Sequence, residues 1–285
     1  MLKLIKEAVP KSKMFTSWLP INVQWLAKVN LLKTLVQRDL EARYKGSILG
    51  NLWPLLNQLS QLLIYTYVFS IILKVKLSLN GLPENDLTFG LWLFAGLIPW
   101  IAFTSGFTQA AGSVINQPNL VKKVVFPLGL LPLVSICSAF VESSVGLMAL
   151  ILLVGISAQT VHSTLWLLPL VWLPQLLLTA GLGYLVAGST VFLRDVPQTL
   201  GVLISLWFYL TPIVYPVSMI PEQWRTWIFW LNPLAAIAEV YRDLVLVGEV
   251  KHWGEWGVAS VVALIVFYVG LKCYQKLRPA FADVL

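Results

Sequence analysis

The sequence has little charge. Asp, Glu, Lys and Arg together make up 12% of its 285 residues, whereas soluble domains carry about 25%. Hydrophobic residues make up 58%, and the mean hydropathy is +0.79. So few charges cannot cover the surface of a soluble domain, and the apolar runs reach the roughly 20 residues that a helix needs to cross a bilayer core. The composition predicts one membrane domain over residues 1–285, with no separate soluble domain.

Cysteine and histidine are also scarce, with two of each. Cys137 lies in an apolar run and Cys273 near the end of the last run, so no disulfide is expected. His162 and His252 stand far from each other and from both cysteines. Because metal-ligand spacing is absent, we expect no metal site.

Two catalytic signatures are missing. No glycine is followed by lysine, so the sequence lacks the phosphate-cradling GxxxxGK[ST] loop, and it also lacks HExxH. We expect that the chain is not an enzyme and does not itself use ATP through such a loop.

Six apolar runs predict an all-α integral membrane protein with six transmembrane helices. They cover approximately residues 47–73, 87–115, 128–156, 165–193, 200–218 and 256–274. The third and fourth runs are long, so tilt or protrusion beyond the lipid is expected. Residues 1–27 lack the continuous apolar core of a signal peptide, and we interpret them as mature cytoplasmic sequence.

The basic residues predict the orientation. With both termini in the cytoplasm, 15 of the 20 Lys and Arg residues lie inside, and those outside are Lys74, Lys76, Arg225, Arg242 and Lys251. This distribution follows the positive-inside rule. The net charge of +7 is therefore explained by topology and anionic lipid, without a nucleic-acid partner.

Residues 28–46 predict an amphipathic helix that lies along the membrane before the first span. Its opposite face is charged, and the candidate contact residues are Arg38, Asp39, Glu41, Arg43 and Lys45. Asp39 precedes Arg43 by four residues, and Glu41 precedes Lys45 by four. Each such pair stabilises the helix by about 0.2–0.5 kcal/mol. Gly46 and Gly50 then allow a bend. The residues alone leave two interpretations equally open, an interfacial anchor and a surface that docks a partner.

Residues 117–127 are a second candidate contact. Pro118 and Pro127 bracket the basic pair Lys122 and Lys123, which suits a short helix across the ends of two spans. The alternative is a basic turn that only obeys the positive-inside rule.

Residues 220–247 predict two short helices that enter the membrane from outside and return. Asn232 and Pro233 end one helix and begin the next, and the second piece is only about 21 Å long. The candidate gate residues are Trp224, Trp227, Glu239, Tyr241, Arg242 and Asp243. Such re-entrant helices need protein or water around them; the alternative is a seventh span.

Aromatic residues in the first and fifth runs are candidates for lining a passage, because flat amphipathic rings suit sugars. They are Tyr65, Tyr67, Phe69, Trp207, Phe208, Tyr209 and Tyr215. Simple helix packing is the alternative for each. Glu142 lies near the middle of the third run, where an acid marks a pathway or a paired site. We favour a structural hydrogen bond across a helix interface over a proton relay.

Five segments resemble the ABC-2 transporter permeases that export O-antigen and related polysaccharides. They are RDLEARYKGSILGNLWPLLNQL, NLVKKVVFPLGLLPL, FLRDVPQ, YLTPIVYP and LNPLAAIAEVYRDLVL, in that order, and the similarity covers nearly the whole chain after about residue 25. The resemblance implies that Leu31–Lys45 is an interface helix and Asn119–Phe126 a coupling helix. It also implies that residues 220–247 are external gate helices.

The resemblance further implies a homodimer with two separate ATPase subunits in the bacterial inner membrane. Those subunits would bind the ATP and Mg²⁺, and this chain would hold no cofactor. The expected substrate is an undecaprenyl-linked polysaccharide of O-antigen type, with teichoic acid or capsular polysaccharide as alternatives. A proton-coupled secondary transporter using Glu142 is less favoured, because that class usually has internal repeats and broken helices in both halves, which are not visible here.

Overall fold

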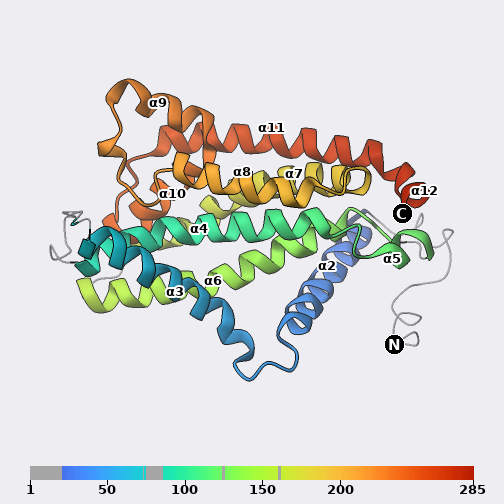
Figure 1. The fold of residues 1–285 in the computed structure, drawn as a ribbon, viewed down its shortest axis with the longest axis horizontal. Helices are drawn as coiled ribbons and strands as arrows, with labels where there is room; N and C mark the ends of the chain where they lie inside the picture. Colours follow the sequence, from blue (N-terminus) through green and yellow to red (C-terminus); the bar gives the residue numbers. More distant parts are fainter. Residues whose placement is uncertain (1–20, 73, 75–85, 124–125, 160–161) are drawn as a thin grey trace.

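The computed structural model describes residues 21–72, 74, 86–123, 126–159 and 162–285, and these ranges contain helices and no strand (Figure 1). The prediction of an all-α membrane protein is confirmed. The longer helices are α2 (Ile21–Tyr44), α3 (Trp53–Thr66), α4 (Asp86–Gly112), α6 (Leu130–Ala158), α7 (Leu168–Phe192), α8 (Val196–Leu210) and α11 (Trp253–Leu277). The shorter ones are α5 (Pro118–Lys123), α9 (Glu222–Leu231), α10 (Pro233–Arg242) and α12 (Phe281–Val284).

Short helical turns connect these elements. They are η1 (Gly50–Leu52), η2 (Tyr67–Ile72), η3 (Ser163–Leu167), η4 (Val217–Met219), η5 (Asp243–Val247) and η6 (Arg278–Ala280). Lys76 lies outside the described residues, as do residues 1–20 of the segment that was expected to be cytoplasmic.

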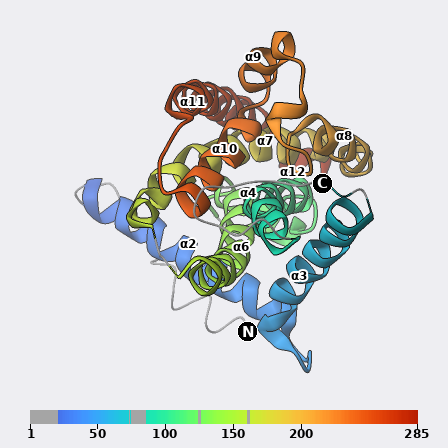
Figure 2. The ribbon, with the colours of Figure 1, turned by 90° about the vertical axis from the view of Figure 1, so that its left-hand side faces the viewer.

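Helix α4 is the centre of the bundle. In the end view, α3, α6, α7, α8 and α10 surround it (Figure 2). Of the residues in its apolar 18-residue stretch, 83% are buried. In the corresponding stretch of α3 and η2, only 11% of the residues are buried, and in that of the segment containing α11, only 17% are buried. The outer helices therefore present apolar faces to something other than this chain, as lipid-exposed or subunit-contacting helices do.

Helices α7 and α11 touch backbone to backbone. A Cβ on Gly270 would lie 2.1 Å from the carbonyl oxygen of Gly181, and a Cβ on Gly181 would lie 2.6 Å from the backbone of Phe267. Small residues let membrane helices approach this closely. The pair fixes α11 against the bundle although most of its surface is exposed.

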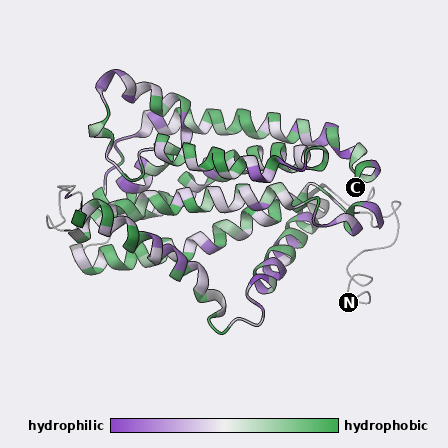
Figure 3. Ribbon diagram, viewed as in Figure 1, coloured by the Kyte–Doolittle hydropathy of each residue, from purple (hydrophilic) through white to green (hydrophobic). Residues whose placement is uncertain are grey.

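The two ends of the bundle differ. Helices α5 and α12 and the carboxy terminus lie at one end, whereas α9 and α10 lie at the other (Figure 1). Hydrophobic colour dominates α4, α7 and α11, whereas hydrophilic colour is frequent on α2 and at the α5 and α12 end (Figure 3). We call the end at which α5 and α12 lie the basic end, because α5 carries Lys122 and Lys123 and η6 begins with Arg278.

Five helical segments are long and apolar enough to cross a membrane. They are Trp53–Ile72, Leu87–Gly112, Leu130–Ser157, Ser163–Phe192 and Trp253–Val284. The predicted bend before the first of them is present, because Gly46 and Gly50 have φ values of 84° and 48°, which favour glycine. Helical structure of this segment resumes at η1, after the bend.

The predicted end of the fifth run is wrong. Helix α8 stops at Leu210 rather than near residue 218, and its 15 residues span about 22 Å. Thr211 leaves the helical conformation immediately before Pro212, as residues before proline tend to do. Helix α8 nevertheless returns the chain to the end where α9 and α10 lie (Figure 1).

Candidate functional site

The exposed charges of α2 form the first candidate surface. Arg38, Glu41 and Lys45 are exposed, and Glu41 accepts a hydrogen bond of 2.9 Å from Gln37 on the same helix. Because these side chains make their local contacts within α2 or extend into solvent, their charges are accessible to a partner.

Asp39 and Arg43 turn toward the bundle instead. Arg43 pairs with Asp39 one turn earlier, and its Nη1 lies 3.3 Å from Oε2 of Glu142 on α6. Tyr44 donates a hydrogen bond of 2.8 Å to Oε1 of the same carboxylate. The sequence placed Asp39 and Arg43 with the partner-facing charges, whereas the structure uses them to join α2 to α6. We call Arg43, Tyr44 and Glu142 the α2–α6 joint.

The joint holds Tyr44 in its neutral form. Burial, followed by the hydrogen bond to Glu142, raises the pKa of Tyr44 to about 12. An ordinary tyrosine is already protonated at neutral pH, and the raised pKa keeps this phenol a donor to the carboxylate into the alkaline range.

Glu142 stands level with the beginning of α3. Gln58, in the second turn of α3, donates a hydrogen bond of 3.4 Å to the backbone oxygen of Glu142. Helix α6 has 29 residues and is about 43 Å long, more than the roughly 30 Å of a bilayer core. Glu142 lies near the middle of α6 and of the candidate span Leu130–Ser157, level with the second turn of α3; its depth in the bilayer stays a prediction.

Helix α5 presents Lys122 and Lys123 as exposed side chains at the basic end. Two largely buried tyrosines hold the turn that follows. Tyr184 of α7 donates a hydrogen bond of 2.9 Å to the Gly129 oxygen, and Tyr274 of α11 donates one of 3.0 Å to the Leu128 oxygen. The corner between α5 and α6 is thereby tied to two further helices.

The two predicted aromatic sets meet. The ring centroids of Tyr65 on α3 and Phe208 on α8 are 5.7 Å apart, and Tyr65 also lies 6.5 Å from Phe69. Trp100 of α4 reaches Phe208 at 5.5 Å and Trp207 at 6.4 Å. Phe208 is buried among these rings, so its described contacts are those of helix packing.

The other predicted lining residues are more open. Tyr67 is 57% exposed and Tyr209 is 67% exposed, while Tyr215 donates a hydrogen bond of 2.9 Å to the Tyr209 oxygen. Tyr67 of η2 and Tyr209 of α8 are therefore available to a second molecule.

The predicted gate residues fall into an exposed and a buried group. Trp224 and Trp227 on α9 are 57% and 59% exposed. Every residue of α10 is buried, and Tyr241 donates a hydrogen bond of 2.9 Å to Gln175 of α7. Helix α10 is thus surrounded by protein, so its charged residues do not face lipid.

Arg242 is the main polar contact of α10. Its Nη1 and Nη2 donate to the backbone oxygens of Pro212 and Ile213 at 2.9 and 2.8 Å, and Nη1 also pairs with Glu239. The guanidinium carbon lies 3.6 Å from the ring centroid of Trp92 on α4. One buried cation therefore connects α10, α4 and the segment that ends α8.

The neighbouring Asp243 binds the loop before α11. Its Oδ2 accepts hydrogen bonds from the backbone nitrogens of Lys251 and His252 and lies 2.9 Å from the His252 ring nitrogen. The hydrogen bond to Asp243 raises the pKa of His252, against the opposing effect of burial. The imidazole thus gains a proton more readily than a free histidine does.

Fold and site together define a helical membrane protein, with apolar outer helices, a charged amphipathic helix and a basic end. The chain belongs to the ABC-2 type transporter family, whose model matches residues 30–246.

Named relatives cover most of the chain. The O-antigen export system permease protein RfbA of Klebsiella pneumoniae is 30% identical over 258 residues, which are 90% of this chain and 95% of the relative. The protein of the same name in Myxococcus xanthus is 31% identical over 261 residues, covering 89% and 94% of the two chains. The polysialic acid transport protein KpsM of Escherichia coli is 25% identical over 253 residues, covering 87% and 94%.

Sequence reasoning missed several residues that hold these sites together. Gln58, Tyr184 and Tyr274 make their bonds to backbone oxygens of distant segments, and no local pattern predicts such partners. A weaker signal existed for Gln58, because it belongs to an unusually polar run in an apolar helix, Asn57–Gln61.

Proposed function

We propose that the protein is the membrane permease of an ATP-driven exporter that carries a lipid-linked polysaccharide of O-antigen type across the bacterial inner membrane. The observation that carries this proposal is the nearly full-length similarity, 94–95% of each relative, to permeases named for O-antigen export. The KpsM relative is less similar, at 25% identity, so capsular polysaccharide is the second candidate substrate.

The proposed assembly contains two copies of this chain and two copies of a separate ATPase, which binds ATP and Mg²⁺. Only 11% of the residues in the apolar stretch of α3 and η2 are buried. This exposed apolar face supports a contact with a second copy or with lipid. The proposed topology has six passes and both termini in the cytoplasm. It is supported by the position of α5, α12 and the carboxy terminus at the basic end (Figure 1).

The proposed mechanism is mechanical. Binding and hydrolysis of ATP in the partner displace α2 and α5, whose exposed cations Arg38 and Lys122 meet it. The α2–α6 joint and the tyrosine-held corner pass this displacement to α6, α7 and α11. A passage then opens along α3 and α8, and the glycan moves across exposed rings such as Tyr67 and Tyr209.

The test is transport with the partner ATPase. Membrane vesicles that contain the permease, its ATPase and the lipid-linked glycan should translocate glycan when ATP is supplied, and should stop when the ATPase is catalytically inactive. Transport that continues with the inactive ATPase and requires a proton gradient would contradict the proposal and favour a secondary transporter.

Charge reversal tests the two proposed levers. Arg38→Glu and Lys122→Glu should each leave membrane insertion intact but reduce glycan exported per ATP hydrolysed, because a reversed charge repels the surface it formerly met. Arg278→Glu, which also reverses an exposed cation at the basic end, is the matched control. Normal export by both lever variants would show that α2 and α5 do not transmit the displacement.

A further inference from the structure

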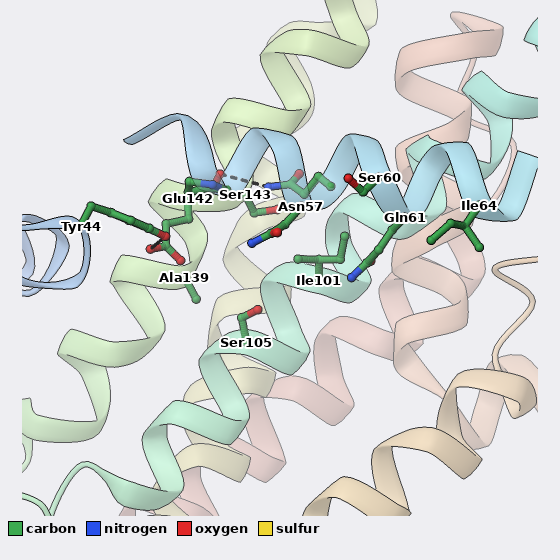
Figure 4. Close-up of a pocket in the computed structure, with 12 residues that line it drawn as sticks. Tyr44, Asn57, Ser60, Gln61, Ile64, Ile101, Ser105, Ala139, Glu142 and Ser143 are labelled. Carbon is green, nitrogen blue, oxygen red and sulfur yellow. Dashed lines mark hydrogen bonds between the residues drawn. The ribbon is translucent and has the colours of Figure 1, made fainter. Parts of the chain in front are cut away.

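A polar pocket lies between α3, α4 and α6, beside the carboxy-terminal end of α2 (Figure 4). Its volume is about 380 Å³, within the range of about 300–1,000 Å³ that is typical of small-molecule sites. Neither the aromatic set nor the charged surfaces described above include it.

The lining is mostly amide and hydroxyl. Helix α3 contributes Asn57, Ser60 and Gln61, and α4 contributes Ser105 (Figure 4). Asn57, Ser60 and Gln61 recur at positions i, i+3 and i+4, so they share one face of the helix, and all three are exposed. A polar stripe on a membrane-spanning helix is unfavourable unless it faces water or a polar ligand.

A buried amide supplies a second, independent observation. Gln58 also lines the pocket and is 3% exposed. Its Nε2 donates to the Glu142 backbone oxygen, but its Oε1 has no hydrogen-bond partner among the described residues. An unpartnered buried acceptor is destabilising unless a donor reaches it. This oxygen faces α6, since a Cβ on Gly146 would lie 1.7 Å from it, so the buried amide forms the wall of the pocket between α3 and α6.

The charges define the class of ligand. The only ionisable groups that line the pocket are Tyr44 and Glu142, and the carboxylate already receives the Tyr44 hydroxyl and lies 3.3 Å from Arg43. A phosphate would meet this carboxylate without a free cation in the lining, and like charges repel. Neutral hydroxyl groups, which both donate and accept, match the exposed amides and hydroxyls of the lining.

We infer that this pocket is a sugar-binding site, which takes a neutral sugar residue of the glycan near the start of α3. The inference rests on the proposed export function and adds to it a specific entry site. Gln61 and Tyr65 lie four residues apart on the same side of α3, and the Tyr65 ring contacts Phe69 of η2 and Phe208 of α8, so the polar pocket leads toward this ring cluster. A sugar released from the amides would next meet aromatic rings.

Direct binding is the first test. The purified complex of permease and ATPase is mixed with the methyl glycosides of glucose, galactose, mannose and N-acetylglucosamine, and saturation-transfer NMR measures contact. At least one glycoside should give a signal that falls about fivefold or more in Gln61→Leu and in Asn57→Leu, because each loses a hydrogen-bonding amide. Gln198→Leu makes the same change at an exposed position at the start of α8 and should bind like the wild type.

Three outcomes would overturn the inference. The first is binding of inorganic pyrophosphate, in place of any glycoside, with loss in the same two variants; this would identify a site for an anionic headgroup. The second is the absence of glycoside binding to the wild-type complex. The third is a disulfide between two copies of a Gln61→Cys variant that also carries Cys137→Ser and Cys273→Ser, which would assign the stripe to a contact between subunits.

A transport measurement separates this inference from the proposed function. In vesicles, Gln61→Leu should raise the KM for lipid-linked glycan about fivefold or more while kcat stays near the wild-type value, and Gln275→Leu, which makes the same change at an exposed position near the end of α11, should change neither. Unchanged KM in an exporting Gln61→Leu variant overturns the sugar site and leaves the export function standing. Absence of ATP-driven glycan transport in the wild type overturns both.

Discussion

Replacing Arg242 with glutamine tests whether one buried cation holds the end of the bundle opposite the basic end. The guanidinium is 2% exposed and donates to the Pro212 and Ile213 oxygens while pairing with Glu239. Removing one partner of a buried ion pair destabilises by about 3–5 kcal/mol, because the other charge is left uncompensated. A single amide can replace at most part of the backbone bonds. For a chain of this size, the loss corresponds to a fall in Tm of about 6–20 °C.

Thermal unfolding of the purified protein, followed with a thiol-reactive fluorophore, measures this loss. Cys137 and Cys273 are both partly buried and free, so unfolding exposes them to the dye. Arg194→Gln, at an exposed site in the turn before α8, should melt within about 2 °C of the wild type, since surface substitutions change stability little.

A second substitution makes the reasoning refutable. If the penalty comes from the uncompensated Glu239 carboxylate, the double variant Arg242→Gln with Glu239→Gln should regain about half of the lost Tm. An Arg242→Gln protein that melts like the wild type would refute the claim that this cation organises the end. A double variant that is no more stable than the single one would show that the lost backbone bonds, and not the carboxylate, set the penalty.

Three further perturbations address the other contacts. Glu142→Gln should speed hydrogen exchange of α2 amides about tenfold or more, because bonds to a charged acceptor stabilise by about 1.5–3 kcal/mol. The control variant Glu41→Gln should leave this exchange unchanged. Equal exchange rates in the two variants would contradict the claim that Glu142 holds α2 against α6. The raised pKa of His252 means that its bond to Asp243 stabilises the fold below about pH 6.5 and that this contribution is lost as pH rises through the folded-state value. His252→Gln should therefore lower Tm more at pH 6 than at pH 9, and a pH-independent loss would be inconsistent with protonation. Tyr184→Phe should lower Tm by about 2–4 °C and reduce export per ATP, whereas unchanged coupling would show that the corner need not be tied to α7.

The fold could largely be predicted because each membrane helix is a local apolar run. Helices α4, α6, α7 and α11 begin and end close to their predicted limits, since burial in lipid requires only length and hydropathy. The exception is α8, where Thr211 and Pro212 end the helix inside a continuous apolar stretch. Hydropathy does not register a change of backbone direction, so the run appeared longer than the helix.

The site could be predicted only in part, because composition identifies a surface but not the partner of a side chain. Glu142 was expected to bond across a helix interface, and it does. Its partners Arg43 and Tyr44 lie about 100 positions away along the chain; Arg43 was expected to contact a partner protein, and Tyr44 was not among the candidate residues. Similarly, the charges of α10 indicated that protein must surround this helix, but the backbone oxygens that receive Arg242 are defined only once α8 has ended.

The strengths of these contacts differ between the two ends of the molecule, and this difference suits a lever. At the end opposite the basic end, Arg242 is wholly enclosed, so its bonds act at low dielectric and resist rearrangement. Nearer the basic end, the Arg43 and Glu142 side chains keep 21% and 15% of their surface accessible, where solvent weakens an ion pair. A displacement of α2 or α5 should therefore rearrange the weaker contacts of the α2–α6 joint before it disturbs the buried contacts of Arg242 at α10. Motion driven from the basic end should alter the polar pocket and the start of α3 first, and the outer helices should follow only when α4 and α8 move.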